Sequence, residues 1–197
     1  MQRKVFVLTG NTGTGKTTVA NYLHEFYEMP KVVTHTTRPP RDGEMDQVDY
    51  YFENRDSFAQ NHYLENVTYS GYQYGSSWEG LERAWEKNPL ITIVLDTAGA
   101  ITYARELGDQ AVIIYLTVTK MDALIDRLVQ RGDNMETVHA RLASAEYQRD
   151  TLLPEELQTV AHVVTNDDWD ETKEVINTIV QNEIKQTGNS ENLGTSV

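Results

Sequence analysis

Four short runs of mainly apolar residues recur along the chain, and each is followed by a segment with helical spacing of apolar positions. The runs cover residues 5–8, 90–95, 111–116 and 160–164. The helical segments are predicted at residues 17–27, 77–87, 100–107, 120–131, 136–150 and 170–184. Apolar runs that alternate with helices are typical of parallel strands buried on both faces. The pattern therefore predicts an α/β fold with a parallel core sheet flanked by helices.

The stretch between the first helix and the second apolar run has a different character. Residues 34–76 are rich in Tyr, Asn and Gly, with short strand-like pieces at 50–53 and 63–69. We interpret this stretch as a small lobe inserted into a core of residues 1–33 and 77–184. Residues 185–197 are polar, with Gly, Asn and Ser, and are predicted to form a disordered tail.

A glycine-rich loop joins the first predicted strand to the first predicted helix. It matches G-x-x-x-x-G-K-[ST], the P-loop pattern, in which backbone N–H groups at a helix N-terminus cradle phosphates. Lys16 is expected to reach the β- and γ-phosphates of ATP, and the Thr17 hydroxyl to bind Mg²⁺. The residues expected to bind the nucleotide are those of the loop and the first helical turn: Gly10, Asn11, Thr12, Gly13, Thr14, Gly15, Lys16, Thr17 and Thr18.

A second group of polar residues follows within the predicted lobe. Arg38 and Arg41 lie on a loop constrained by Pro and Gly, and planar guanidinium groups suit the dianion of a monophosphate. Tyr50 and Tyr74 add hydroxyl donors for the same phosphate, and Glu44 is expected to orient the arginines. A triphosphate site beside a second anion site predicts a kinase that transfers a phosphoryl group between two small molecules.

Composition narrows the class of partner. The net charge is −13, with 17 Lys and Arg, and nucleic-acid binding needs a basic surface. The chain has no cysteine, which excludes thiolate chemistry and Cys-based zinc sites. No stretch has transmembrane length, and the first apolar run is too short for a signal peptide. We therefore expect a cytoplasmic monomer or homodimer that binds nucleotides, without nucleic-acid or membrane partners.

Four segments in order resemble the guanylate kinases. Residues 34–44 match [ST]-x-T-T-R-x-P-R-x-G-E and precede D-Y-x-F at 49–52, and residues 65–76 match E-x-x-x-x-x-G-x-x-Y-G-[ST]. Residues 127–132 read R-L-x-x-R-G, with R-L at 141–142, and residues 166–168 read N-D-D. The resemblance runs from about residue 5 to residue 182.

The resemblance implies the reaction ATP + GMP ⇌ ADP + GDP with Mg²⁺ and assigns residues to the acceptor. Glu65 would accept hydrogen bonds from guanine N1–H and the 2-amino group, a pair of donors that adenine lacks. Thr34 and Ser76 would complete the recognition of the base. Asn166 would contact the adenine of ATP, and Asp96 would contact Mg²⁺.

It also implies a lid over the phosphates at about residues 127–150. Phosphoryl transfer depends mainly on positioning and on neutralisation of charge, which arginines and lysines provide. Closure of a lid also excludes water as a competing acceptor. The residues expected to act in catalysis are cations: Lys16, Arg38, Arg127, Arg131 and Arg141.

One segment departs from the pattern of the family. Where the family usually shows Asp-hydrophobic-Asp-x-Gln-Gly, residues 95–100 read L-D-T-A-G-A. We interpret this segment as about two residues shorter and as lacking the second carboxylate, which helps to define the guanine pocket. The sequence therefore leaves open an acceptor other than GMP, such as another (deoxy)nucleotide.

Two other classes of protein compete with the kinase. D-x-x-G at 96–99 and T-K-x-D at 119–122 resemble GTPase motifs. In the GTPase fold, two strands with a helix between them separate these motifs, whereas residues 100–118 hold only one predicted helix and one predicted strand. Thr119 is instead expected to cap a helix, with Asp122 in the capping box. A catalytically inactive scaffold or nucleotide-binding domain is the other alternative, although such domains typically lose the P-loop, which is present here.

Overall fold

The core of the protein is a parallel sheet of four strands. The structure, a computed structural model, describes residues 2–69, 71–120, 124, 127 and 135–192. The order of the strands in the core sheet is β6-β1-β7-β8, and all three pairings are parallel. The bounds are β1 (Lys4–Gly10), β6 (Leu90–Val94), β7 (Ala111–Thr117) and β8 (Ala161–Thr165). The predicted α/β fold with a parallel core sheet is confirmed.

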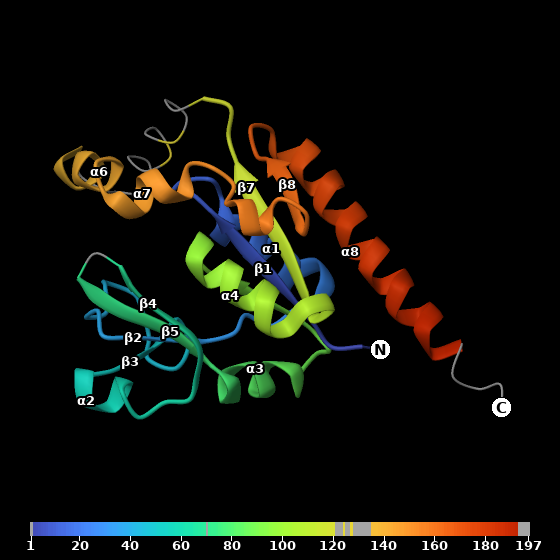
Figure 1. The fold of residues 1–197 in the computed structure, drawn as a ribbon, viewed down its shortest axis with the longest axis horizontal. Helices are drawn as coiled ribbons and strands as arrows, with labels where there is room; N and C mark the ends of the chain where they lie inside the picture. Colours follow the sequence, from blue (N-terminus) through green and yellow to red (C-terminus); the bar gives the residue numbers. More distant parts are fainter. Residues whose placement is uncertain (1, 70, 121–123, 125–126, 128–134, 193–197) are drawn as a thin grey trace.

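Helices cover both faces of this sheet (Figure 1). The first layer contains α1 (Lys16–Tyr27) and α8 (Trp169–Asn192), and the second contains α3 (Trp78–Trp85) and α4 (Thr97–Leu107). Successive residues of β1 face opposite layers, as the period of a strand requires. Phe6 and Leu8 pack with α1 and α8, while Val5 and Val7 pack with α3 and α4. The strands are therefore buried on both sides.

A second sheet forms the stretch for which the sequence predicted a lobe, and it projects to one side of the core (Figure 1). Its order is β3-β2-β5-β4. Its elements are β2 (Thr34–Thr36), β3 (Tyr50–Phe52), α2 (Arg55–Phe58), β4 (Tyr63–Tyr69) and β5 (Tyr72–Ser77). The sequence did not predict β2 and β5 because one is very short and the other lacks an apolar run.

A buried histidine ties this sheet to α3. His35 lies between the rings of Tyr51 and Tyr63, at centroid distances of 4.7 and 5.5 Å. Its Nδ1 contacts Glu53, and its Nε2 lies 3.0 Å from Ser77 Oγ. Ser77 in turn caps α3, because its Oγ accepts from Gly80 N at 3.1 Å. The lobe is thus fixed to the core at the start of α3.

Two predicted helices have different bounds in the structure. Helix α4 begins three residues before the predicted 100–107 because the Asp96 side chain caps its N-terminus. The predicted helix at 136–150 is two helices, α6 (Met135–Leu142) and α7 (Ala145–Asp150). The break comes at Ser144, whose Oγ accepts from Tyr147 N at 3.1 Å and so starts α7. Two short 3-10 turns, Gly108–Gln110 and Glu155–Leu157, precede β7 and β8.

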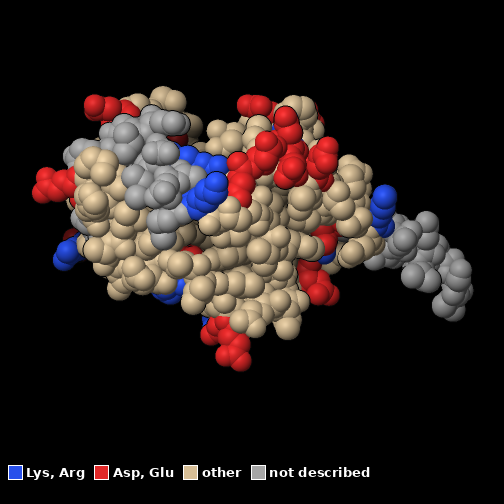
Figure 2. Space-filling view, turned by 90° about the horizontal axis from the view of Figure 1, so that it is seen from above, with Lys and Arg blue, Asp and Glu red and all other residues tan. Residues whose placement is uncertain are grey.

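The C-terminal prediction is wrong in part. Helix α8 continues to Asn192, so residues 185–192 are helical and not a disordered tail. Polar Gln, Glu and Lys residues have good helix propensity, which allows a solvated extension of this kind. Most of the predicted helix at 120–131 and residues 193–197 lie outside the described residues. No helix in the described ranges is long and apolar enough to span a membrane. Figure 2 shows a cluster of acidic side chains on the face that it draws, with a smaller group of Lys and Arg side chains directly beside it.

Candidate active site

The P-loop adopts a backbone that glycine alone accommodates at two positions. Gly10 has φ 120°, and a Cβ there would lie 2.1 Å from the carbonyl oxygen of Leu116. Gly15 has φ 96°, and its Cβ would lie 2.2 Å from Asn166 Nδ2. Side chains at either position would combine backbone strain with a clash. The tight loop leaves its N–H groups near the N-terminus of α1, as phosphate binding requires.

Lys16 and Thr14 shape the interior of this loop. Lys16 Nζ donates to the carbonyl oxygens of Gly10 and Asn11, both at 2.7 Å. Thr14 Oγ1 is buried and donates to the same oxygen of Asn11 at 2.8 Å. The ammonium group is therefore held over the loop, where the phosphates of a nucleotide would lie.

A pocket of about 530 Å³ opens beside the P-loop. Its lining residues come from the loop, α1, the segment after β7 and the end of β8: Thr12, Gly13, Gly15, Lys16, Thr17, Thr18, Arg127, Asn166 and Trp169. Arg127 donates from Nη2 to the Asn166 carbonyl oxygen at 2.8 Å. The structure thus brings the first predicted lid arginine to the expected nucleotide site. Arg131 lies outside the described residues, and the side chain of Arg141, in α6, is not described.

Asn166 holds the P-loop in this structure. Its Nδ2 donates to the Thr14 carbonyl oxygen at 2.8 Å, and its Oδ1 accepts from Thr172 at 3.0 Å. The residue is only 5% exposed. Both polar atoms of the amide are therefore bonded within the protein, and the contact with adenine stays a prediction. The Thr119 hydroxyl donates to Asp167 at 2.6 Å, and the predicted cap stays a prediction because Asp122 lies outside the described residues.

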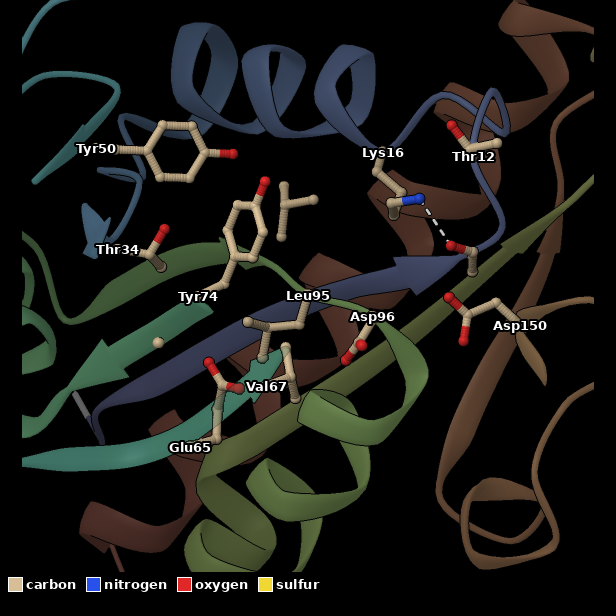
Figure 3. Close-up of a pocket in the computed structure, with 13 residues that line it drawn as sticks. Thr12, Lys16, Thr34, Tyr50, Glu65, Val67, Tyr74, Leu95, Asp96 and Asp150 are labelled. Carbon is tan, nitrogen blue, oxygen red and sulfur yellow. Dashed lines mark hydrogen bonds between the residues drawn. The ribbon is translucent and has the colours of Figure 1, made fainter. Parts of the chain in front are cut away.

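A second pocket, of about 240 Å³, lies between the P-loop and the second sheet (Figure 3). Figure 3 shows Tyr50, Thr34 and Tyr74 toward the lobe, and Lys16, Thr12 and Asp150 toward the P-loop. The lining residues come from both sheets and from α7: Gly10, Thr12, Lys16, Thr34, Tyr50, Glu65, Val67, Tyr74, Gly75, Val94, Leu95, Asp96 and Asp150. Lys16 lines both pockets, so their contents would meet at its ammonium group.

Arg38 and Glu44 form an ion pair next to the tyrosines of this pocket. Arg38 Nη2 donates to Glu44 Oε1 at 2.8 Å, and its guanidinium carbon lies 5.4 Å from the centre of the Tyr50 ring. The hydrogen bond from Arg38 lowers the pKa of the Glu44 carboxyl. Arg41 donates from its backbone N to Glu44 Oε2 at 2.7 Å, and its side chain is exposed. Glu44 therefore orients Arg38, the arrangement that the sequence predicted.

Glu65 is the buried carboxylate of this pocket. It is 6% exposed, and its Oε1 accepts from Ser76 Oγ at 3.0 Å. Ser76 in turn accepts from the hydroxyl of Tyr103 at 2.7 Å. Glu65 Oε2 is buried without a hydrogen-bond partner among the described residues. Burial, together with the charge of Asp96, raises the pKa of the Glu65 carboxyl to about 7. A buried acceptor of this kind favours a ligand that supplies an N–H donor.

Asp96 lies beside Glu65 in the structure. Its Oδ1 accepts from Gly99 N at 2.8 Å and so caps α4. Asp96 Oδ1 and Glu65 Oε2 each lie 3.3 Å from the position that a Cβ would take on Gly99. The two carboxylates therefore flank this glycine from different elements. The role of Asp96 as a ligand of Mg²⁺ stays a prediction.

The expected loss of the second carboxylate of the family pattern stays a prediction. Strand β6 pairs with β1 in register to its end, with Val94 opposite Leu8, and Leu95 N donates to the Leu8 carbonyl oxygen at 3.1 Å. The chain therefore runs directly from β6 into Asp96 and α4. Residues 94–99 can also be matched to the family pattern without a gap, which puts Asp96 at its second Asp, Gly99 at its Gly and Val94 at its first Asp.

Several residues of the site were not predicted from the sequence. Tyr103 supports Ser76 from α4, and Val67 lines the second pocket from β4. Asp150 lines the same pocket from α7, where Arg149 binds both Asp150 and Asp96. The one sequence signal for Arg149 and Asp150 was that Arg149 is a fourth arginine inside the predicted lid.

Two pockets that share a P-loop lysine, one of them with an arginine and tyrosine end and a carboxylate end, define a P-loop phosphotransferase for small phosphorylated molecules. A sequence model of the guanylate kinase family matches residues 2–183. The chain therefore belongs to the guanylate kinase family.

Individual relatives agree with this family over most of their length. A guanylate kinase of Thermus thermophilus is 36% identical over 153 residues, which cover 75% of this chain and 69% of the relative. One of Neisseria meningitidis serogroup A is 33% identical over 182 residues, covering 89% and 86%. The crystal structure of guanylate kinase from Anaplasma phagocytophilum has a TM-score of 0.65 at 26% identity, covering 92% of this chain and 86% of that one.

Proposed function

We propose that this protein is a guanylate kinase that transfers the γ-phosphoryl group of ATP to GMP. The observation that carries the proposal is the buried Glu65 carboxylate, which has an oxygen without a partner among the described residues, in a pocket that reaches Lys16 of the P-loop. Guanine offers N1–H and a 2-amino group on one edge, and adenine has no N1–H to offer. AMP would leave the Glu65 oxygen unpaired, which costs about 1–3 kcal/mol.

The base and the phosphate of GMP would occupy opposite ends of the second pocket. Glu65 would accept from N1–H, and Asp96 would accept from the 2-amino group, since the two carboxylates flank Gly99. We therefore assign Asp96 to the acceptor base in preference to Mg²⁺. Arg38, Tyr50 and Tyr74 would bind the phosphate at the tyrosine end of the pocket, as planar and hydroxyl donors suit a dianion.

The P-loop pocket would hold ATP. Lys16 would move from its carbonyl partners to the β- and γ-phosphates, and Arg127 lies in the same pocket. The γ-phosphorus would form a bond to a phosphate oxygen of GMP while its bond to the β-phosphate oxygen breaks. Positioning and neutralisation of charge account for most of such catalysis.

Mg²⁺ fits this site as a partner of the nucleotide. Thr17 lies at the start of α1 in the P-loop pocket, and the described residues contain no group of three or more metal-binding side chains. Mg²⁺ commonly binds through one or two protein ligands, substrate phosphates and water. Thr17 would hold the ion, which would supply positive charge to neutralise the phosphates of ATP.

An assay of ADP formation from Mg·ATP, with and without GMP, tests the proposal. We expect turnover that depends on GMP. Comparable nucleotide hydrolysis without any acceptor would contradict the proposal and favour the GTPase-like alternative. Tight ATP binding without transfer to any monophosphate would favour the scaffold.

Substitution of Arg41 tests the phosphate end of the second pocket, which we call the acceptor pocket because it would hold GMP. We expect Arg41→Ala to raise the KM for GMP by about tenfold, because an exposed guanidinium near the pocket loses one charge-assisted contact. The KM for ATP should stay unchanged. Arg55→Ala is the matched control, since Arg55 is an exposed arginine of the same lobe. An unchanged KM for GMP in Arg41→Ala would remove Arg41 from the site.

The raised pKa of Glu65 predicts that kcat/KM for GMP falls as the pH is lowered below 7. The protonated carboxyl donates where guanine also donates, so GMP needs the ionised form. With a pKa of about 7, kcat/KM for GMP should fall about fivefold from pH 7 to pH 6, since kcat/KM reports the free enzyme. A pH series with wild type and Glu65→Gln measures this. The phosphate of GMP titrates in both proteins, so an equal fall in Glu65→Gln would contradict the assignment.

The raised pKa of Glu65 affects the stability of the unliganded protein in the opposite direction from its effect on GMP binding. Because the pKa of Glu65 is raised in the folded state, its contribution to stability is present below the unfolded value of 4.5 and is lost as the pH rises through about 7. Acid therefore favours the fold at this residue while it weakens GMP binding.

A further inference from the structure

Arg149 pairs with two carboxylates that line the acceptor pocket, Asp96 and Asp150, and does not line the pocket itself. It lies in the last turn of α7, where its Nη2 donates to Asp96 Oδ2 at 2.7 Å and its Nε donates to Asp150 Oδ1 at 2.8 Å. The Asp96 and Asp150 side chains are 12% and 7% exposed. The Arg149 side chain is 38% exposed, so each pair joins a well-covered carboxylate to a partly exposed guanidinium.

The helix that carries Arg149 is itself anchored to the P-loop. Asn11 Nδ2 donates to the Tyr147 carbonyl oxygen at 3.3 Å and to Thr151 Oγ1 at 3.1 Å. On the other side, the hydroxyl of Tyr115 donates to the Asp150 carbonyl oxygen at 2.9 Å. Arg149 therefore projects from a segment with hydrogen bonds to the P-loop and to β7.

Asp150 connects the same segment to the start of α4. Its Oδ1 accepts from the hydroxyl of Thr97, the first residue of α4, and Thr97 is fully buried. Asp96 caps the same helix. Arg149, Asp96 and Asp150 thus form one network, which we call the α7–α4 bridge, between the P-loop side and the base end of the acceptor pocket.

The negative charge of the acceptor pocket would hinder the entry of a phosphate, and the positive charge of Arg149 reduces it. Its lining contains the carboxylates of Glu65, Asp96 and Asp150 together with Lys16. A monophosphate dianion enters more easily when a guanidinium paired with two of these carboxylates offsets part of their negative charge. Arg149 does so without itself lining the pocket.

We propose that Arg149 is a positioning residue for the acceptor base, and that it acts by fixing the Asp96 carboxylate beside Glu65. The proposal rests on the proposed function, since it concerns how GMP is read. In this arrangement Asp96 Oδ2 is held by Arg149 and Oδ1 by Gly99 N. The carboxylate can then accept from the 2-amino group of guanine with its remaining lone pairs, in one fixed orientation.

A comparison of GMP with inosine monophosphate, which lacks the 2-amino group, tests this role. The variants are Arg149→Met, which keeps the length but removes the charge, and Arg149→Lys, which can keep one ion pair. Loss of one oriented hydrogen bond costs about 1–1.5 kcal/mol, so we expect Arg149→Met to raise the KM for GMP about tenfold. The KM for inosine monophosphate should change less than about twofold, with kcat and the KM for ATP nearly unchanged. Arg149→Lys should lie between wild type and Arg149→Met.

Two further variants separate positioning from general destabilisation. Arg105→Met is the matched control, because Arg105 is an exposed arginine that pairs with its neighbour Glu106 on α4. In Asp96→Asn, the addition of Arg149→Met should raise the KM for GMP much less than in wild type, since both changes remove the same contact. If Arg149→Met does not fold, Arg149→Lys carries the test, with an expected increase of about threefold in the KM for GMP.

The result that would overturn the proposal is an equal loss with the two acceptors. A fall in kcat for GMP and inosine monophosphate alike, with an unchanged KM for GMP, would place Arg149 at the transferred phosphoryl group. No effect in either variant would likewise overturn the proposal. Failure of the proposed function is distinguishable, because it is read from wild type alone: wild type would then turn over no GMP.

Discussion

Replacement of Lys16 by Ala is expected to reduce kcat for phosphoryl transfer by about a thousandfold, because little covalent chemistry is left to the protein in this reaction. Lys16 is the residue that lines both pockets and contributes an ammonium group to each. Its Nζ already lies over the P-loop, 2.7 Å from two carbonyl oxygens, so nucleotide phosphates would meet a positioned cation. The measurement is single-turnover transfer from Mg·ATP to saturating GMP.

The control for this substitution removes an exposed lysine that lies away from the site. Lys87→Ala serves, since Lys87 is exposed and lies beyond the end of α3. The thermal unfolding of both variants should match that of wild type. A Lys16→Ala protein that keeps a tenth or more of the wild-type kcat would show that the triphosphate binds elsewhere.

Replacement of Glu65 by Gln is expected to reduce kcat/KM for GMP by about a hundredfold, because the amide NH2 would then face N1–H and the 2-amino group of guanine, which are both donors. The preference for GMP over AMP should shrink by a similar factor, since an amide can pair with adenine. The substitution keeps the shape of the side chain, and Ser76 can still bond to the amide oxygen. The measurement is kcat/KM for GMP and for AMP at pH 8, where the wild-type carboxyl is ionised.

Glu25→Gln is the matched control for Glu65, because it makes the same change at an exposed position of α1. Its ratio of kcat/KM for GMP to that for AMP should equal the wild-type ratio. If Glu65→Gln leaves the selectivity for guanine unaltered, the base lies in another part of the pocket.

The parts of the site that depend on local sequence were predictable. The P-loop is one continuous segment, and its glycines are required by the backbone of that segment itself. The same holds for Arg38 and Glu44, whose ion pair spans six residues of one loop. Short-range spacing carries this information because the chain between such residues has few conformations to choose from.

The place of Asp96 beside Glu65 was not predictable from local sequence because it depends on strand register. Strand β6 pairs with β1 as far as Val94 opposite Leu8, and this pairing sets where the chain leaves the sheet and reaches Asp96. Register is fixed by contacts between strands that are distant in the sequence, and the apolar run alone does not specify where pairing ends.

Arg149 and Asp150 were not predictable for a related reason. Each meets its partner on the α4 side across 53 residues of chain. The sequence offered them only as two charged residues near the end of a helix, and such residues are usually solvated. The prediction of one continuous helix was also wrong here, because the chain breaks at Ser144. The direction of α7 after this break decides where Arg149 and Asp150 lie.

The central claim is that the pocket between the P-loop and the second sheet selects guanine. The most direct measurement is ADP release from Mg·ATP with a panel of GMP, dGMP, AMP, CMP, UMP and dTMP. A rate confined to GMP and dGMP is predicted, because Glu65 and Asp96 flank one edge of the base. Turnover that favours another monophosphate, or that needs none, would contradict the account.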